Sequence, residues 1–425
     1  MADDRVERGS TRVEGFLSGE LDFQLMRSLG AGNYGGATPG EVFATRAVVN
    51  GDDPYAWREA LAAMAERVLN SGQKSLERGH RISARDHFLR ASMYYRAAEY
   101  FADPFGPDTV KWGLASRDAF CAAAELISDR IEPVEIPFEK KGLPGYFMAP
   151  ANGAERGKTV VVLTGFDGTA EELYFQVAAA GLERGYNILI AQGPGQVGCL
   201  RIHPDLKFRP DCEKPVGAIL DFALARPEVA AERLALYGIS FGGYFVTRAA
   251  EHDGRIKALI ANSPIVNLYA YMAGFIGPEF AANPPPVSLN EVDEIPENDF
   301  PCEAKLSFKA ACRRFGVDSF ATWLSRLKDF NAEENWPRFV ARPSQWSARA
   351  KVRKLCASRS DSSRAYPARS RNGFSQSRKG PTPTARWGTC LSPTLSSLTG
   401  SASFSPRKAQ LPDKPCACRY VEGVT

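Results

Sequence analysis

Histidine is scarce in this sequence, whose 425 residues include four, at positions 80, 87, 203 and 252. No histidine follows residue 252, so the last part of the chain offers no imidazole as a general base or metal ligand. No run of about 18 apolar residues occurs, and the charged start lacks the apolar stretch of a secretory signal. The nine cysteines show no metal-ligand or paired spacing. We therefore expect a cytoplasmic protein with reduced thiols, no metal, no cofactor and no membrane partner.

Charge is distributed unevenly along the chain. Residues 344–425 carry 15 Lys and Arg against 3 Asp and Glu, whereas residues 1–343 carry 38 against 46. The tail also has 15 serines, 10 arginines and no isoleucine, and shows no strand or amphipathic helix. A basic tail usually indicates a nucleic-acid or anionic partner. We expect no nucleic-acid partner here, for a reason given below.

Helical periodicity dominates the first third of the chain. After a flexible N-terminus (1–20), residues 21–130 are expected to form a helical accessory or cap domain. Apolar residues recur at three- and four-residue spacing, as in Trp57, Leu61, Met64 and Val68. Asp53 before Pro54 is typical of a helix N-cap, and a further helix is expected from about Thr109 to Ser128.

Strand patterns follow and predict an α/β core over residues 131–343. Lys140-Lys-Gly142 separates two short strands, as in an antiparallel hairpin. Runs that are apolar on both faces then alternate with helical stretches, which predicts a doubly wound, mostly parallel sheet. These runs are Thr159–Leu163, Asn187–Ala191, Leu234–Tyr237 and Ala258–Ala261. Residues 267–336, with an expected helix from Phe315 to Phe330, form either a lid insertion or further core helices.

The most informative motif is Gly238-Ile-Ser-Phe-Gly242, which follows a buried strand and precedes a helical stretch. This G-x-S-x-G pattern is typical of a nucleophile elbow, in which a sharp turn lifts the serine hydroxyl clear of the backbone. Gly238 and Gly242 avoid the clashes that a Cβ would cause in that turn. Ser240 is therefore the expected nucleophile.

Acyl transfer also needs hydrogen-bond donors for the oxyanion. One expected donor is the backbone N–H of Phe241. The second is expected in the turn Thr164-Gly-Phe-Asp-Gly168, from the N–H of Phe166, with Asp167 as the alternative donor. The sequence Thr169-Ala-Glu-Glu172 predicts a capping box that would hold this turn in place.

These motifs together resemble one group of α/β-hydrolases, those of fungal polyketide and polyketide–nonribosomal-peptide gene clusters, such as fusarin- and cytochalasin-type mycotoxin pathways. That group is related to the polyketide-shortening hydrolase of melanin synthesis and to dihydroxypseudooxynicotine hydrolase. The resemblance covers about residues 20–340 and implies an α/β-hydrolase fold with a serine nucleophile. It also implies hydrolysis of an ester, lactone, amide or C–C bond in a polyketide-type small molecule. The stretches that carry it are Asp22-Phe-Gln24, Gly32–Gly36, Gly165–Gly168, Glu171–Tyr174, Gly193–Gln196, Phe208–Pro210, Arg226–Glu228 and Gly238–Gly243.

The chain departs from this pattern after the elbow. The fold places an acid and then a histidine after the serine, yet His252, twelve residues on, would lie about 18 Å away along one helix. His203 is expected to be a surface or substrate-contacting residue. Asp329 and Asp361 are the nearest acids in chain order, but neither follows a recognisable strand, so the triad acid stays unassigned.

A lost reading frame is our hypothesis for the missing histidine. Shifted back by one nucleotide, residues 379–391 can be encoded to read Gly-Ala-Asp-Ala-His-Cys-Gln-Val-Gly-Asn-Leu, which resembles the segment that carries the family's catalytic histidine. We therefore hypothesise that the frame is lost near Pro343 and that residues 344–425 are mistranslated. An alternative is an inactive hydrolase-fold scaffold or binding protein. A homodimer is also compatible with the sequence.

Overall fold

The computed structural model describes residues 15–153 and 156–333, and these all belong to one compact unit. The predictions for residues 344–425, including Asp361, concern residues outside this range. No helix in the part of the chain that the structure describes is both long and apolar enough to cross a bilayer.

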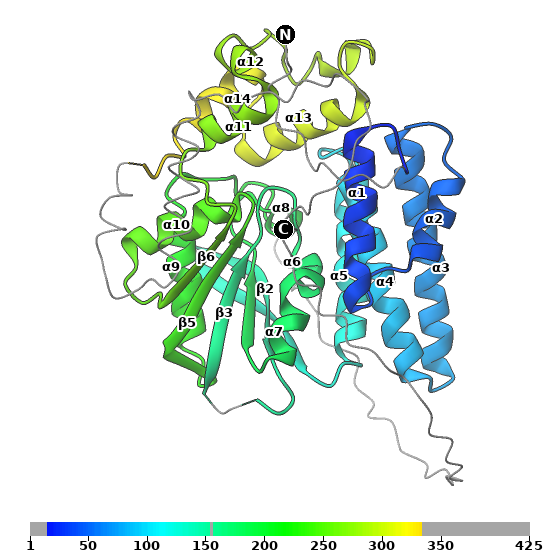
Figure 1. Ribbon diagram of the computed structural model, residues 1–425, viewed down its shortest axis with the longest axis vertical. Helices are drawn as coiled ribbons and strands as arrows, with labels where there is room; N and C mark the ends of the chain where they lie inside the picture. Colours follow the sequence, from blue (N-terminus) through cyan, green and yellow to red (C-terminus); the bar gives the residue numbers. More distant parts are fainter. Residues whose placement is uncertain (1–14, 154–155, 334–425) are drawn as a thin grey trace, which may run out of the picture. The chain divides into compact units, whose positions relative to one another are not determined.

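Helices form the first part of the described chain (Figure 1). In α3 the Asp53 side chain accepts hydrogen bonds from the N–H groups of Tyr55 and Ala56, and Pro54 occupies the first turn. The residues expected to share one face, including Trp57 and Leu61, are buried. The helices are α1 (Gly19–Gly30), α2 (Pro39–Ala47), α3 (Pro54–Glu77), α4 (Arg81–Tyr100) and α5 (Pro107–Ala124).

The sheet is mixed, in the order β1-β2-β4-β3-β5-β6. The antiparallel hairpin is confirmed, with Val134 opposite Gly145, and β2 also runs antiparallel to β4. The remaining neighbours are parallel, as expected from their apolar runs. The strands are β1 (Arg130–Phe138), β2 (Lys141–Ala149), β3 (Gly157–Leu163), β4 (Asn187–Ala191), β5 (Val229–Ile239) and β6 (Ala258–Asn262).

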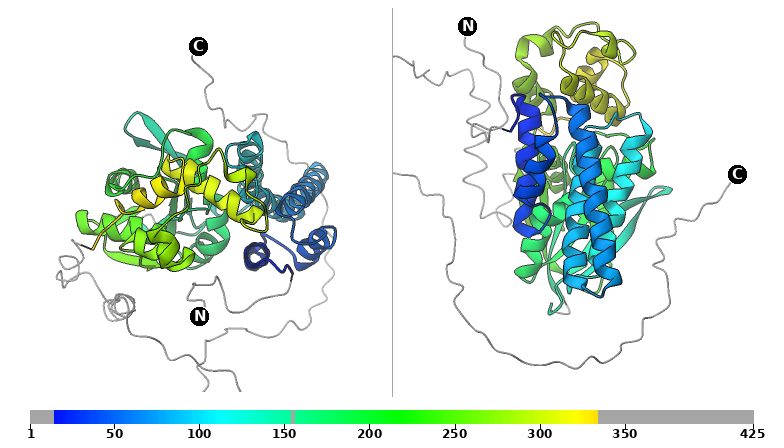
Figure 2. Two further views of the ribbon diagram at one scale, coloured as in Figure 1. Left: turned by 90° about the horizontal axis from the view of Figure 1, so that it is seen from above. Right: turned by 90° about the vertical axis from the view of Figure 1, so that its right-hand side faces the viewer.

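Helices cover both faces of this sheet (Figures 1 and 2). On one face, α9 (Glu213–Leu224) and α10 (Gly242–His252) pack through an apolar cluster that includes Val246. On the other face, α6 (Ala170–Leu173), a π-helical turn (Tyr174–Ala178) and α7 (Ala179–Glu183) share a second cluster with α4 and α5. The short α8 (Val197–Ile202) follows β4. This layering confirms the expected α/β class.

The described segment after β6 contains four α-helices and a short 3-10 helix (Val292–Glu294). The α-helices are α11 (Leu268–Ile276), α12 (Pro278–Ala282), α13 (Cys302–Phe315) and α14 (Phe320–Leu327). The expected single helix from Phe315 to Phe330 is wrong. Instead α13 ends there, because Gly316 adopts a left-handed φ of 68°. The next helix starts at a capping box between Ser319 and Thr322. Phe315 and Phe330 pack in the same cluster as Phe241, so this segment buries part of the sheet's apolar surface.

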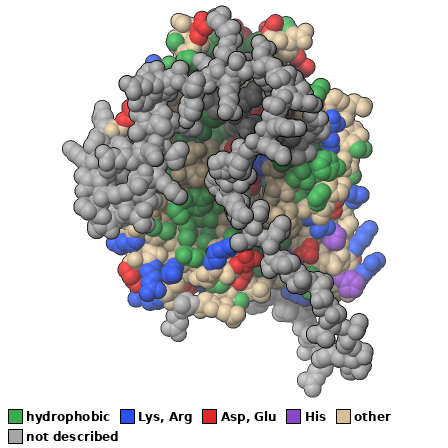
Figure 3. Space-filling view, viewed as in Figure 1, with side chains coloured by type: hydrophobic (Ala, Val, Ile, Leu, Met, Phe, Trp, Pro, Cys, Tyr) green, Lys and Arg blue, Asp and Glu red, His purple; other side chains and the backbone are tan. Residues whose placement is uncertain are grey.

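The sheet ends at β6 within the described residues, where no strand pairs with its outer side. Ile260 of this strand is 49% exposed. In Figure 3, hydrophobic side chains gather in the middle of the face that Figure 1 presents. An edge strand with an exposed large apolar residue is a site where further pairing is favourable.

Glu251, near the end of α10, makes the stability of the folded state depend on pH. Neither of its buried carboxylate oxygens has a hydrogen-bond partner among the described residues. Burial raises its pKa from 4.5 to about 7; Glu213 adds to this rise and Arg248 opposes it. The stability that its neutral form contributes is therefore complete below about pH 4.5 and is lost as the pH rises through about 7.

We expect Glu251→Gln to be more stable than the wild type at pH 8 by about 1–2 kcal/mol, a value discounted for partial exposure. The difference should shrink as the pH falls through 7 toward 4.5 and should vanish below 4.5, where the wild-type carboxyl becomes neutral in both the folded and the unfolded state. Urea unfolding across this pH range measures it, with the exposed Glu279→Gln as the matched control. A difference that does not change with pH would contradict the assignment.

Candidate active site

Ser240 lies in the turn between β5 and α10 and has a left-handed backbone with φ of 55°. A non-glycine residue rarely adopts this conformation, which costs about 1–3 kcal/mol and persists where the surrounding structure enforces it. Two backbone hydrogen bonds fix the turn. The N–H of Ser240 donates to the Asn262 carbonyl at 2.5 Å, and the N–H of Gly243 donates to the Ser240 carbonyl at 2.8 Å. The residue itself is half-buried.

The glycines around Ser240 allow close approach of the backbone. A Cβ on Gly238 would lie 2.1 Å from the Gly242 carbonyl oxygen, and a Cβ on Gly242 would lie 2.6 Å from the Leu163 carbonyl oxygen. Gly243 is as constrained, with its Cβ position 1.8 Å from the Ser263 carbonyl oxygen. A side chain at any of the three would force the turn apart, so the glycine pattern and the strained serine belong to one local structure.

The loop after β3, residues 164–168, lies directly against this turn. A Cβ on Gly165 would lie 2.7 Å from the backbone nitrogen of Phe241 and 2.9 Å from the Cβ of Ser240. Within the described residues, the N–H groups of Phe241 and of Phe166 have no hydrogen-bond acceptor. Unpaired backbone donors at sites poor in water are unusual and costly. Both residues expected to donate to an oxyanion thus carry an unused N–H; Phe241 follows Ser240 in the chain, and Phe166 follows Gly165, which closely approaches Ser240.

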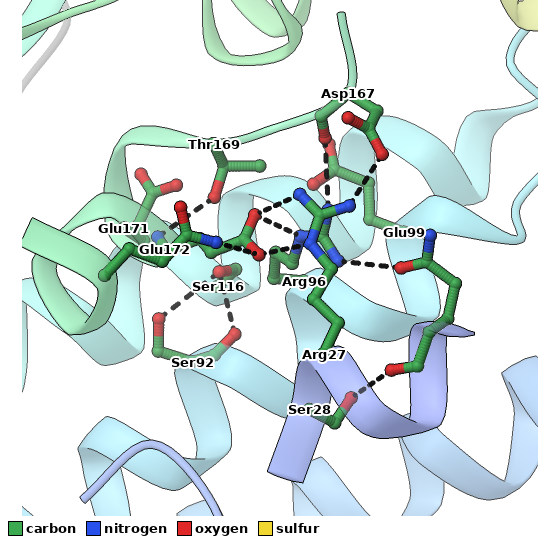
Figure 4. A network of polar contacts seen from close by, with 12 residues as sticks. Arg27, Ser28, Ser92, Arg96, Glu99, Ser116, Asp167, Thr169, Glu171 and Glu172 are labelled. Atoms are coloured by element: carbon green, nitrogen blue, oxygen red, sulfur yellow. Dashed lines mark hydrogen bonds and ion pairs between the residues drawn. The ribbon is translucent and has the colours of Figure 1, made fainter. Parts of the chain in front are cut away.

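Asp167, the alternative donor, is held by its side chain and carbonyl (Figure 4). Its carboxylate accepts from Arg27 Nη1 of α1 at 2.6 Å, and its carbonyl accepts from Arg96 Nη2 of α4 at 3.2 Å. A further hydrogen bond, from Gln196 Nε2 to the Thr164 carbonyl at 2.6 Å, fixes the start of the loop. The 164–168 loop is therefore anchored to the helical domain.

Glu172 is the centre of the same network. Thr169 Oγ1 accepts from the Glu172 N–H at 3.2 Å, as the capping box predicts. The Glu172 carboxylate does not complete that box among the described contacts; it pairs with Arg27 and with Arg96 (3.1 Å) instead. The expectation was half wrong because the two buried guanidinium groups attract this carboxylate more strongly than one backbone N–H does.

Burial and the neighbouring charges shift the pKa values of the two arginines in this network. Burial alone would lower the pKa of Arg27, yet Asp167 and Glu172 hold it above its ordinary value. Burial lowers the pKa of Arg96, and the neighbouring Arg27 cation lowers it further. A second pair, Arg201 with Glu99, lies beside it, with both side chains 4% exposed.

Sequence reasoning missed these ionic residues. A signal was present, because Arg96 and Glu99 interrupt the otherwise apolar face of α4, a segment whose residues from Ala91 to Glu99 are all buried. Charged residues at buried positions almost always have partners. Their partners, Glu172 and Arg201, lie far from α4 in the sequence, so the identity of these partners could not be inferred from spacing.

None of the four histidines makes a hydrogen bond to Ser240 in the described part of the chain. His203 Nε2 contacts the Gly142 carbonyl at 2.9 Å, and His252 Nδ1 contacts the Arg248 carbonyl at 2.9 Å in the last turn of α10. His87 contacts the Ser83 carbonyl within α4. Asp329 is exposed and pairs with Arg326 at 2.8 Å. The acid and the base thus remain unassigned among these residues.

A parallel-containing sheet with helices on both faces and a strained serine at a strand-to-helix turn defines the α/β-hydrolase class. A profile described as the prolyl oligopeptidase family matches residues 214–293, which include Ser240. The α/β hydrolase gkaG of Penicillium citrinum is 32% identical over 336 residues, which cover 74% of this chain and 76% of the relative. The chain belongs to the α/β-hydrolase family represented by such fungal enzymes.

Other relatives match over a shorter stretch. The hydrolyase poxO of Penicillium oxalicum is 35% identical over 274 residues, which cover 62% of this chain and 65% of the relative. The match to the hydrolase ORFZ of Pyricularia oryzae covers 66% of that protein. The chain therefore spans just under two thirds of the length of these relatives.

Solved structures agree on the fold. The structure of 2,6-dihydroxy-pseudo-oxynicotine hydrolase aligns with a TM-score of 0.54 at 18% identity, covering 72% of this chain and 76% of that chain. The structure of wild-type AbyA5 aligns with a TM-score of 0.52 at 15% identity, covering 76% of each chain. At these identities the likeness concerns the fold alone.

Proposed function

We propose that this chain is a cytoplasmic serine hydrolase that cleaves an ester, lactone, amide or C–C bond of a polyketide-derived intermediate in secondary-metabolite biosynthesis. The observation that carries the proposal is the left-handed Ser240 beside the unpaired N–H groups of Phe241 and Phe166. The names of the fungal relatives support hydrolysis as the reaction class.

In the proposed reaction, Ser240 Oγ attacks the substrate carbonyl carbon while a general base takes the hydroxyl proton. The N–H groups of Phe241 and of Phe166, or alternatively of Asp167, stabilise the oxyanion, and the N-terminus of α10 adds its positive dipole end. The leaving group departs with a proton, and water then releases the acyl group from Ser240. The base is the component that the described residues do not supply.

Labelling with a fluorophosphonate, which phosphonylates activated serines, tests the nucleophile. We expect slow labelling of the wild-type chain at Ser240, found by peptide mass spectrometry, and none of Ser240→Ala. Ser307→Ala, which removes an exposed serine of the nearby pocket, is the matched control and should label as the wild type does. Labelling that survives in Ser240→Ala would contradict the proposal.

A second function, a catalytically inactive binding protein or scaffold, is favoured by the absence of a histidine hydrogen-bonded to Ser240 in the described residues. A folded wild-type chain that never labels, yet binds polyketide-type ligands, would support this alternative.

A further inference from the structure

A pocket opens between the helical domain, the 164–168 loop and α13. A water-sized sphere can occupy about 50 Å³ of it, and its walls include Tyr100, Phe166, Asp167, Leu306 and Arg314. Ser240 is not one of its lining residues among those described, but Phe166 is, and it belongs to the loop that lies against the Ser240 turn. Its position beside a proposed oxyanion donor makes it the natural place for the part of the substrate that does not react.

The charges in this pocket are almost all neutralised by partners in the protein. Glu99 pairs with Arg201, Asp167 pairs with Arg27, and Arg96 pairs with Glu172. Glu303, another lining residue, accepts a hydrogen bond from the uncharged Ser18 Oγ at 2.9 Å. Arg314 differs, because no carboxylate within the described residues lies within ion-pair distance of its guanidinium group.

Arg314 is nevertheless held in place. Its guanidinium carbon lies 4.3 Å from the centre of the Phe166 ring, and its backbone carbonyl accepts a hydrogen bond from the Phe208 N–H at 2.8 Å. Stacking on an aromatic ring leaves the edge of a guanidinium group free to donate two parallel hydrogen bonds. Burial lowers the pKa of Arg314 to about 10, an effect that Asp167, Tyr100 and Glu99 partly oppose. The group is therefore still a cation at neutral pH; it is half-buried and has no ion-pair partner among the described residues.

We propose that Arg314 binds an anionic oxygen group of the substrate, a carboxylate or an acidic enol, in the pocket beside Phe166. An anion there would supply the counter-charge that no described carboxylate provides, and it would accept two charge-assisted hydrogen bonds from the guanidinium group. Because Arg314 stacks on Phe166, such a substrate would place its anionic group one aromatic ring away from the proposed oxyanion site. This inference rests on the proposed function, since it treats the pocket as the substrate pocket.

Binding of a matched pair of ligands tests the inference. We use 4-phenylbutyrate and its neutral amide, 4-phenylbutyramide, in ligand-observed NMR titrations at pH 7.5 and low salt. The wild type is expected to bind the acid more tightly than the amide. Arg314→Gln should weaken binding of the acid by about tenfold and leave the amide unchanged, and Arg314→Lys should restore part of the loss.

Arg313→Gln is the control, because this neighbouring arginine of α13 does not line the pocket in the described structure. It should bind both ligands as the wild type does. The inference is overturned if Arg314→Gln binds the acid normally, if it weakens both ligands equally, or if the wild type does not prefer the acid. The titration requires no reaction at Ser240, so failure of serine labelling and failure of anion binding are separate results.

Discussion

Replacing residues 344–425 by the translation of the alternative reading frame should raise the rate of ester hydrolysis by about 10³- to 10⁴-fold. With permitted codons, that frame can encode a histidine in an Asp-Ala-His-Cys-Gln segment, and loss of a triad member typically costs a factor of this size. Without an imidazole near Ser240, the hydroxyl proton has no acceptor and the serine is a poor nucleophile. Hydrolysis of a p-nitrophenyl ester by the two chains measures the gain.

The control for this experiment is Ser240→Ala in the restored chain, which should fall back to the rate of the original chain. Mutation of the restored histidine to Ala should do the same, because the two residues act as a unit. Equal rates in both chains, or a transcript whose uninterrupted frame gives residues 344–425 as they stand together with full activity, would refute the lost-frame hypothesis.

The second large effect is expected at Glu172. Glu172→Gln removes the carboxylate that pairs with both Arg27 and Arg96 and leaves two guanidinium groups facing one another where Arg96 and Glu172 are each 2% exposed. Removing one partner from a buried ion pair typically costs about 3–5 kcal/mol, because the remaining charge stays buried. We expect a loss of this size in the free energy of unfolding, measured by urea denaturation.

Glu183→Gln is the matched control, since this exposed glutamate at the end of α7 pairs loosely with Arg184 at 3.8 Å. Its loss should cost less than about 1 kcal/mol. Adding Arg96→Met to Glu172→Gln should recover part of the stability, because the second change removes an unpaired cation. A loss at Glu172 no larger than that at Glu183 would mean that the network does not hold the two layers together.

The sequence predicted the features that depend on local patterns. The hairpin, the four parallel-type strands and the N-cap at Asp53 follow from periodicity and capping preferences, and the structure confirms them. The catalytic roles of Ser240, Phe241 and Phe166 stay predictions, although the strained turn and the unpaired N–H groups are what such roles require.

The sequence did not predict features that depend on distant contacts. Glu172 looked like a capping residue because the motif is local, whereas the arginines that recruit its side chain come from α1 and α4. The break at Gly316 was missed because apolar residues continue on both sides of it, from Phe315 to Phe320. Nothing in the sequence around Arg314 indicated a binding role, because that role depends on the pocket that the residue lines.

The Arg27–Glu172 contact also bears on how the chain folds. Its two residues are 145 positions apart, so closing this contact requires a long loop and contributes to a high contact order. The helices and the sheet can each form before this contact does. The 164–168 loop that contains Phe166 is anchored only after the helical domain has packed against the sheet. Molecules caught part-way through synthesis or refolding would therefore lack the anchored loop beside Ser240, so that the proposed oxyanion site forms only when the tertiary structure is complete.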